Sequence, residues 1–164
     1  MAATTTAPTH VSHHDATRAA VSTTALGVCA LRVWESKRDP AERLIYDPFA
    51  AVLCGNESPE LPLQEEVGQN KEFWMDFIGV RSHWIDQEVS NFPMAQLVIL
   101  GAGLDTRAYR LSSLKDVPVF EVDFEEVLSA KATLLEAHAP LAQLHNCPAN
   151  LITAPWESQL LRRG

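Results

Sequence analysis

The sequence predicts an α/β fold, with an N-terminal helical cap at residues 20–93 followed by a parallel β-sheet at residues 94–164. Two short, continuous apolar runs, at 96–100 (QLVIL) and 118–122 (PVFEV), are typical of strands that are buried on both faces. Each run is followed by a helical segment, and strands that alternate with helices indicate a parallel sheet. Before residue 93, apolar residues recur at helical spacing instead.

Composition limits the class of protein. The 164 residues suit one domain, and 46% hydrophobic with 21% charged residues is typical of a globular chain. The net charge of −8 argues against a nucleic acid partner, because phosphate binding needs clustered basic residues. We find neither a membrane-span-length apolar run nor a secretory signal. Cys29, Cys54 and Cys147 indicate reduced thiols of an intracellular protein, neither a disulfide framework nor a metal site. The expected location is cytoplasmic, with an organelle transit peptide in the N-terminal tail as the alternative.

The helical part is predicted from local stop and start signals. Residues 1–19, rich in Thr, Ala and His, are expected to form a disordered tail. A helix begins where one of the residues 22–24 can act as its N-cap, and it ends at Asp39-Pro40, because the residue before a proline disfavours the helical conformation. A turn at Asp47-Pro48 leads into a short helix that stops at Gly55-Asn56.

The next helix is predicted at residues 69–92, after a loop at 57–68, and its apolar face contains an arginine. Arg81 lies three residues after Ile78 and four before Ile85. Because a buried arginine is costly unless it is paired, Arg81 is expected in an ion pair, beside a polar cavity, or at the edge of the face with its guanidinium in solvent.

A ligand site is indicated where the two apolar strands end. Gly101 and Gly103 form a tight turn that lets the backbone approach a ligand, and the N-terminus of the following helix favours negative charge. Asp123, at the tip of the second strand, can accept the hydroxyls of a ribose. Thr106 replaces the third glycine of dinucleotide sites, which favours S-adenosylmethionine over NAD. A structural turn without a ligand is the alternative.

The remaining segments are expected to complete the βα pattern. Residues 123–138 form an amphipathic helix with Lys131 on its apolar face, residues 147–153 form a third strand, and a further helix begins at Trp156. Asp105 and Arg107 are expected to cap and stabilise the turn. We expect Glu121 to be a polar residue at the sheet edge rather than a catalytic group.

Four segments carry a resemblance to a known family: VSTTALGVCALRVWESKRDPAERLIYDPFAA, RSHWID, QLVILGAGLDTRAYRL and VFEVDFEEVLSAKATLL. They closely resemble the S-adenosylmethionine-dependent methyltransferases of the leucine carboxyl methyltransferase superfamily, nearest to O-methyltransferases related to polyketide carboxyl methylation enzymes. The similarity covers residues 21–164. It implies the first half of a Rossmann-like class I methyltransferase sheet, and methylation of a carboxylate on a small molecule or a protein C-terminus. A carboxylate is already ionised at neutral pH, so no catalytic base is assigned.

The resemblance also implies a set of cofactor-binding residues, which are Lys37, Arg81, Gly101, Gly103, Asp123, Asn150 and Leu151. Arg81 matches an arginine that grips the methionine carboxylate, and Lys37 matches a lysine placed nearby. Asn150 and Leu151 stand where the family has an Asp-Leu pair that contacts the adenine. Asparagine offers both a donor and an acceptor to an adenine edge.

Family members continue through a fourth strand, with a Glu-Gly segment near the cofactor, beyond the position that matches Gly164. The resemblance therefore implies that one wall of the cofactor cleft is missing and that residues 97–100 form an exposed apolar edge. The alternative function is a catalytically inactive, truncated domain that binds the cofactor weakly or serves in protein contacts. An NAD-dependent oxidoreductase is disfavoured by Thr106 and by the lack of a recognisable catalytic Tyr/Lys or His site. The sequence leaves the oligomeric state open.

Overall fold

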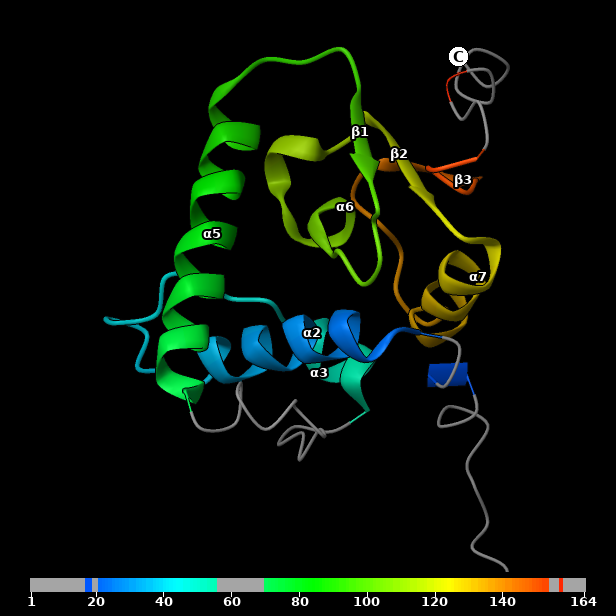
Figure 1. Ribbon diagram of the computed structural model, residues 1–164. Coiled ribbons are helices and arrows are strands. Elements are labelled where there is room, and N and C mark those ends of the chain that lie inside the picture. The colour runs from blue at the N-terminus through cyan, green and yellow to red at the C-terminus, as the bar shows by residue number, and fades with distance from the viewer. Residues whose placement is uncertain (1–16, 19–20, 56–69, 154–156, 158–164) are drawn as a thin grey trace, which may run out of the picture.

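A computed structural model describes residues 17–18, 21–55, 70–153 and 157 of the chain (Figure 1). Its elements are, in order, α2 (Thr23–Ser36), α3 (Ala50–Cys54), α5 (Lys71–Asn91), β1 (Leu97–Leu100), α6 (Arg107–Arg110), the 3-10 helix η1 (Ser112–Leu114), β2 (Pro118–Asp123), α7 (Glu125–Leu134) and β3 (Gln143–Pro148). Within these ranges the strands form a parallel sheet in the order β1-β2-β3. The predicted α/β class is confirmed.

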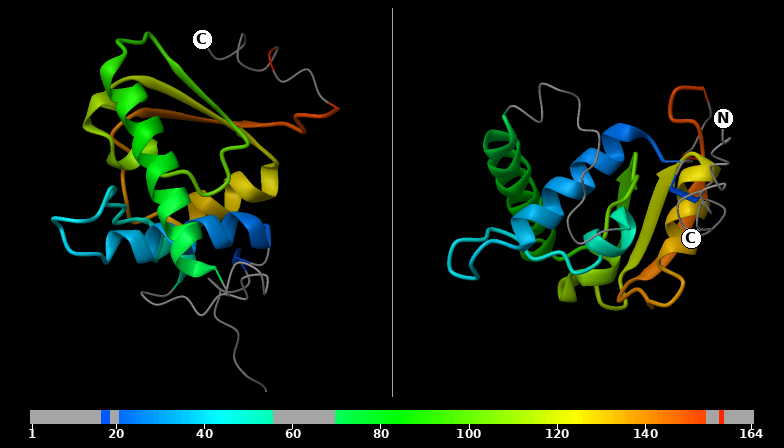
Figure 2. Two further views of the ribbon diagram at one scale, coloured as in Figure 1. Left: turned by 60° about the vertical axis from the view of Figure 1, so that its left-hand side comes forward. Right: turned by 90° about the horizontal axis from the view of Figure 1, so that it is seen from below.

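The N-terminal helices share a core with one face of the sheet. Figures 1 and 2 show α5 on the β1 side of the sheet and α2 running across below the strands. Side chains of β2 alternate between the two faces: Val119 joins the larger cluster with Cys29 and Leu53 of the helical part, whereas Phe120 and Val122 belong to a smaller cluster on the other face. The segment before residue 93 therefore packs directly onto the sheet.

The predicted helix boundaries in the N-terminal part are confirmed by their caps. Ser22 precedes α2, and its hydroxyl oxygen accepts a hydrogen bond of 3.1 Å from the Ala25 amide. The helix α2 ends at Ser36, shortly before Asp39-Pro40. Gly55 ends α3 in the left-handed conformation, at φ 75°, which glycine adopts without steric cost.

Parts of the predicted tail and loop lie outside the described residues, namely residues 1–16, 19 and 57–68. Arg18, inside the expected tail, is described. Its Nε donates to the Leu53 carbonyl at 2.9 Å and its Nη2 donates to the Val52 carbonyl at 3.0 Å. Because these carbonyls belong to the last turn of α3, Arg18 helps to cap that helix and is part of the fold.

The third strand begins earlier than the sequence predicts. It spans Gln143–Pro148 rather than 147–153, and residues 151–153 form a turn. Among the described residues β3 pairs with β2 alone, so it accommodates Gln143, His145 and Asn146 and lacks the continuous apolar run of a central strand. Apart from Glu157, the helix expected from Trp156 lies outside the described residues.

The helix after the glycine turn is short. The helix α6 has only four residues, and Leu111 then adopts an extended conformation before η1. Four residues align few peptide dipoles, so the preference for negative charge that we expected at this helix N-terminus is weak.

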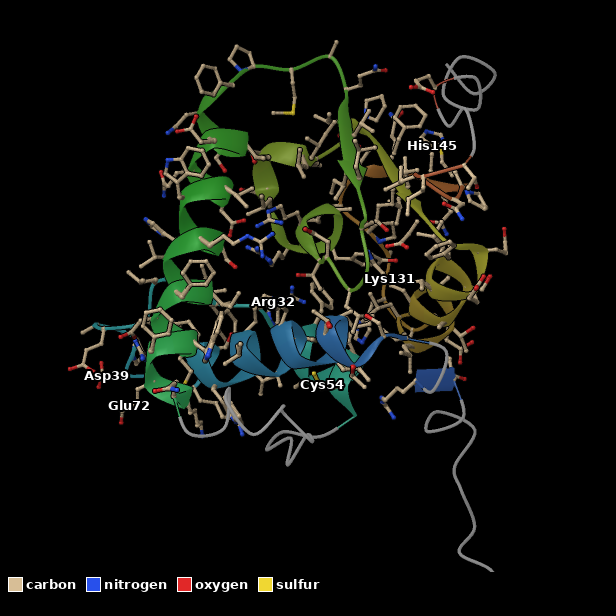
Figure 3. All side chains as sticks on the ribbon, viewed as in Figure 1. Arg32, Asp39, Cys54, Glu72, Lys131 and His145 are labelled. Atoms are coloured by element: carbon tan, nitrogen blue, oxygen red, sulfur yellow. The ribbon has the colours of Figure 1, made fainter. Side chains whose placement is uncertain are left out.

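Glu121 is not the polar-edge residue that the sequence suggests. Its side chain is 1% exposed and faces α7, where Lys131 is 2% exposed. Lys131 Nζ donates to both carboxylate oxygens at 2.6 Å, and Figure 3 shows Lys131 on the side of α7 that faces the sheet. The expected position of Lys131 on the apolar face of its helix is confirmed. Lys131 can be buried there because the buried Glu121 carboxylate supplies its counter-charge.

The helix α5 exposes much of its apolar side. Phe73, Phe77, Val80 and Trp84 are each 50–63% exposed and follow one another at spacings of four, three and four residues. Its buried side consists instead of Ile78, Gly79, Ser82 and Asp86. A β-carbon on Gly79 would lie 3.2 Å from Glu35 Cδ of α2, so the glycine permits the close approach of the two helices.

The four exposed apolar side chains of α5 form what we call the α5 stripe, and Leu100 at the end of β1 is also 50% exposed. This exposed apolar surface predicts that the chain self-associates. Light scattering after gel filtration should show species larger than a monomer as concentration increases. Replacing both Phe77 and Trp84 with serine should shift the distribution toward monomer. Tyr46→Ser, at an exposed aromatic residue outside the stripe, is the matched control. A compact, protease-resistant monomer at every concentration would contradict the prediction.

Candidate cofactor site

A pocket of about 320 Å³ lies beside the carboxyl ends of β1 and β2. The parts of its lining that bear on ligand binding are Arg32 of α2, Arg81 of α5, Gly101, Gly103 and Asp105 of the turn after β1, and Asp123 of β2. Four of the seven predicted site residues therefore meet in one pocket. The volume is at the lower end of the range for small-molecule sites.

The glycine turn forms one wall of the pocket. Gly101 and Gly103 have φ of 63° and 49°, in the left-handed region. The amides of Gly101 and Ala102 both donate to the Val122 carbonyl, at 2.8 and 3.2 Å, which ties the turn to β2. A β-carbon on Gly101 would meet no atom within 4 Å, so the turn presents bare backbone to open space.

Asp123 connects the turn to the strand tip. One carboxylate oxygen accepts a hydrogen bond of 2.7 Å from the Gly103 amide, and the other accepts one of 2.8 Å from the Phe124 amide. Each oxygen of an ionised carboxylate has a second acceptor position. The side chain is therefore fixed in place by the backbone and can still accept two hydroxyl groups from a ligand in the pocket.

Arg81 is exposed and lines the pocket, which fits two of the three expectations for this residue: a position beside a polar cavity, and a position at the edge of the face with its guanidinium in solvent. Within the described part of the chain it forms no hydrogen bond or ion pair, unlike the other arginines of the pocket. Its guanidinium can therefore receive an anionic ligand group without breaking an existing contact.

A buried cluster behind the pocket was not predicted. Arg32 donates from Nη2 to the Leu104 carbonyl at 2.6 Å, and its Nε lies 3.0 Å from Asp47 Oδ2. Thr106 donates to the same Asp47 oxygen at 2.7 Å. All three side chains are buried, and Figure 3 shows Arg32 on the side of α2 that faces α6. Thr106, at the position of the third glycine in dinucleotide sites, thus anchors the turn to the segment before α3.

A second set of ion pairs joins α5 to α6. Asp86 accepts from Arg107 Nε at 2.8 Å and from two Arg110 nitrogens at 2.6 and 2.9 Å. Arg107 also pairs with Asp105, which accepts the Arg107 amide at 2.8 Å. Asp105 and Arg107 thus have the structural roles expected of them, whereas the N-cap residue of α6 is Thr106, whose side chain makes no capping hydrogen bond. Because α5 is held to the turn at Asp86, Arg81, five residues earlier, is held beside the same pocket.

Electrostatics keep Asp105 ionised. Burial raises the pKa of this carboxyl, but the positive charges of Arg107, Lys131 and Arg32 lower it by more, so its pKa lies below the ordinary value. Asp105 and Asp123 line the pocket together with Arg32 of α2 and Arg81 of α5.

The other three predicted residues do not line this pocket. Lys37 is exposed at the C-terminal end of α2, at the opposite end of that helix from Ser22, which lines the pocket. Asn150 and Leu151 follow β3, at the same carboxyl edge of the sheet as Asp123. The Asn150 side-chain oxygen accepts the Ile152 amide at 2.9 Å, and Leu151 is exposed.

The sequence contains only weak signals for Arg32 and Asp47, which were not among the predicted site residues. Arg32 stands among apolar residues of a helix, and Asp47 precedes a proline, which indicates only a turn. Their partnership joins positions 15 residues apart in sequence and cannot be found from local spacing. Arg81 attracts attention in the sequence because it is an arginine within an apolar helix face, and the same criterion applies to Arg32.

Comparison with known proteins agrees with the resemblance described above. The family model of "Leucine carboxyl methyltransferase" matches residues 25–164. A protein of Saccharopolyspora erythraea is 34% identical over 154 residues, which is 88% of this chain and 52% of that protein. Proteins of Mycobacteroides abscessus and Mycobacterium marinum are 33% and 35% identical over 158 and 160 residues, covering 88% of this chain and 51% of each protein. All three are named "Putative S-adenosyl-L-methionine-dependent methyltransferase".

The chain thus spans about half the length of the curated relatives it matches. No helix in the described residues is long and apolar enough to cross a membrane. The family match covers most of α2, the other described helices and strands, the glycine turn and Asp123, and so includes most of the residues that line the pocket. The chain belongs to the leucine carboxyl methyltransferase family.

Proposed function

We propose that this chain binds S-adenosylmethionine in the pocket between α2, α5 and the glycine turn, and that it supports O-methylation of a carboxylate on a small molecule or a protein C-terminus. The observation that carries the proposal is the convergence of Arg81, the two glycines and Asp123 on one pocket. The names of the family and of the relatives support the same cofactor and reaction. The free thiols support a cytoplasmic location.

The residues of the pocket fit the separate parts of this cofactor. Asp123 can accept the two ribose hydroxyls, because its own backbone contacts leave one acceptor position on each oxygen. Arg81 can pair with the methionine carboxylate in a bidentate arrangement. The turn at Gly101 and Gly103 allows the backbone to lie close to the ligand. Asn150 and Leu151, at the same sheet edge, remain our candidates for contacts to the adenine. Lys37 remains our candidate for a contact near the methionine carboxylate.

When bound, the cofactor supplies the methyl group of its sulfonium, which is transferred to an oxygen of the acceptor. An acceptor carboxylate is ionised at neutral pH, so the chain needs no base to activate it. The contribution of the protein is then to orient the two reactants, which can supply about 7–11 kcal/mol of the barrier in favourable cases. Arg81 would hold the methionine carboxylate of the cofactor, and Asp123 would hold its ribose.

The proposal is tested by isothermal titration of the chain with S-adenosylmethionine, S-adenosylhomocysteine, 5′-methylthioadenosine and, for comparison, NAD. S-Adenosylmethionine and S-adenosylhomocysteine should bind. Arg81→Gln should weaken both by about 10–100-fold, the value of a hydrogen-bonded charge pair. The same variant should leave the affinity for 5′-methylthioadenosine unchanged, because that ligand lacks the carboxylate. Asp123→Asn should weaken all three ligands.

Arg43→Gln is the matched control, because Arg43 lies over the Tyr46 ring and does not line the pocket. Tighter binding of NAD than of S-adenosylmethionine would refute the proposed cofactor. If the folded chain binds none of the ligands, the alternative stands: a catalytically inactive domain that acts through protein contacts.

A further inference from the structure

Two helices contribute polar side chains to one end of the cofactor pocket, which we call the α2–α5 end. Its lining includes Arg32 of α2 and both Arg81 and Ser82 of α5. The two helices meet closely beside it, because a β-carbon on Gly79 would lie 3.2 Å from Glu35 Cδ. Arg32 and Ser82 each lie about one helical turn from that contact. They therefore belong to neighbouring turns of the two helices.

Ser82 presents to the pocket a hydroxyl that no other described residue engages. The residue is 7% exposed and lines the pocket. Within the described residues its hydroxyl forms no hydrogen bond, and this oxygen is not one of the completely buried atoms that lack a partner. Because a largely buried hydroxyl is costly without a partner, its position in the pocket favours a hydrogen-bond acceptor on the ligand.

Arg32 has one nitrogen that can serve a ligand. Its Nη2 donates to the Leu104 carbonyl at 2.6 Å, and its Nε lies 3.0 Å from Asp47 Oδ2, so the guanidinium is fixed in place. Nη1 forms no hydrogen bond in the described part of the chain, and it is not one of the completely buried atoms that lack a partner. Since the side chain lines the pocket and is 10% exposed, Nη1 is available there without the loss of an existing contact.

The charges around the α2–α5 end favour one anionic group. Asp47, Asp86 and Asp105 each pair with an arginine other than Arg81. Asp123, the other carboxylate of the pocket lining, accepts backbone amides instead. Among the described residues the charge of Arg81 is therefore not balanced by an ion pair. A ligand carboxylate would balance it and would accept up to four hydrogen bonds, more than one guanidinium supplies to it.

We propose that Arg32 and Ser82 complete, with Arg81, one carboxylate subsite at the α2–α5 end of the pocket. The inference rests on the proposed function, and it assigns the methionine carboxylate of S-adenosylmethionine to this subsite. A guanidinium from each helix and one hydroxyl then supply donors to both carboxylate oxygens. Because Arg32 is already held by the protein, little side-chain freedom is lost when the ligand binds.

The test compares two ligands that differ in the carboxylate alone, S-adenosylhomocysteine and decarboxylated S-adenosylhomocysteine. Isothermal titration gives a dissociation constant for each ligand, and the ratio of the two constants measures the preference for the carboxylate. A variant that merely loosens the fold weakens both ligands and leaves this ratio unchanged. The unmutated chain should prefer S-adenosylhomocysteine by about 100-fold or more, the value of several hydrogen bonds to a charged group.

Two variants of α5 separate the contributions to the preference. Arg81→Gln should lower it but leave a residual preference of about tenfold, because Arg32 and Ser82 still bind the carboxylate. Ser82→Ala should lower the preference by about 3–10-fold. The matched control is Ser90→Ala, at an exposed serine of the same helix that bonds to Ser113 and does not line the pocket. This control should leave the preference unchanged.

Arg32 is tested together with its partner, because Arg32→Gln alone leaves the buried Asp47 without its counter-charge. The double variant Arg32→Gln with Asp47→Asn removes both charges and should lower the preference by about tenfold. Asp47→Asn alone keeps Arg32 and should not lower it. Circular dichroism checks that each variant is folded before titration.

The outcomes separate this inference from the proposed function. If Arg81→Gln alone abolishes the preference, the inference is overturned, and this result does not depend on whether the Arg32 variant folds. An unchanged preference in both Ser82→Ala and the double variant would overturn it as well. So would an unmutated chain that binds S-adenosylhomocysteine and its decarboxylated form equally, although the proposed cofactor would then stand. No binding of S-adenosylhomocysteine at all would overturn both.

Discussion

Lys131→Met is expected to lower the free energy of unfolding by about 3–5 kcal/mol, the cost of leaving one charge of a buried pair without its partner. Lys131 and Glu121 are 2% and 1% exposed, and Nζ lies 2.6 Å from both carboxylate oxygens. The substitution keeps the apolar stem and removes the ammonium. Urea unfolding at neutral pH, followed by circular dichroism, measures the effect.

The loss should depend on pH in a defined direction. Burial raises the pKa of Glu121 above its ordinary 4.5, and Lys131 is the neighbour that lowers it most. Without Lys131 the folded-state pKa rises further, so the folded variant binds a proton that the unfolded chain releases. The unfolding free energy of Lys131→Met, relative to the unmutated chain, should therefore fall as pH rises from the folded-state pKa of Glu121 in the unmutated chain, which already lies above 4.5, to its higher folded-state pKa in the variant, and should level off beyond that.

The matched control replaces both partners. Glu121→Leu combined with Lys131→Met removes both charges and keeps similar side-chain volumes, and such replacements are often neutral or stabilising. The double variant should therefore recover most of the stability lost in the single one. Equal destabilisation of the single and double variants would show that the packing of Lys131, rather than its charge, matters.

Asp47→Ala is expected to be similarly severe, at about 3–5 kcal/mol, because it leaves the buried Arg32 without its counter-charge. The same carboxylate accepts hydrogen bonds from the Thr106 hydroxyl and from the amides of Phe49 and Ala50. Removing it leaves these donors unsatisfied and frees the glycine turn from the segment before α3. Differential scanning calorimetry measures the loss of stability.

The comparison variant for Asp47 is Asp76→Ala. Asp76 pairs with Arg38 at 2.6 Å, but its side chain is 62% exposed, so the loss should be about 0–1 kcal/mol. If the two variants lose similar stability, the cluster of Arg32, Asp47 and Thr106 is not the anchor of the turn. A partly folded Asp47→Ala chain should also bind S-adenosylhomocysteine more weakly, because Arg32 and the turn both line the pocket.

The local features of this protein could be predicted from the sequence. The Ser22 cap, the Gly55 stop, the glycine turn and the position of Asp123 at a strand tip each depend on residues that are near one another in the chain. Each of these signals is a steric or hydrogen-bonding preference of one residue type in one backbone conformation. The third strand was misplaced because its polar residues give no such signal.

The partnerships between distant residues were decided only by the tertiary structure. Helical periodicity shows that α5 has distinct faces, but not that Asp86 turns inward to Arg107 and Arg110 while the α5 stripe stays exposed. Thr106 and Asp47 are 59 residues apart in the sequence, and Glu121 of β2 pairs with Lys131 of α7. A buried charge is stable only beside its counter-charge, and the packing of whole elements determines which residue supplies it.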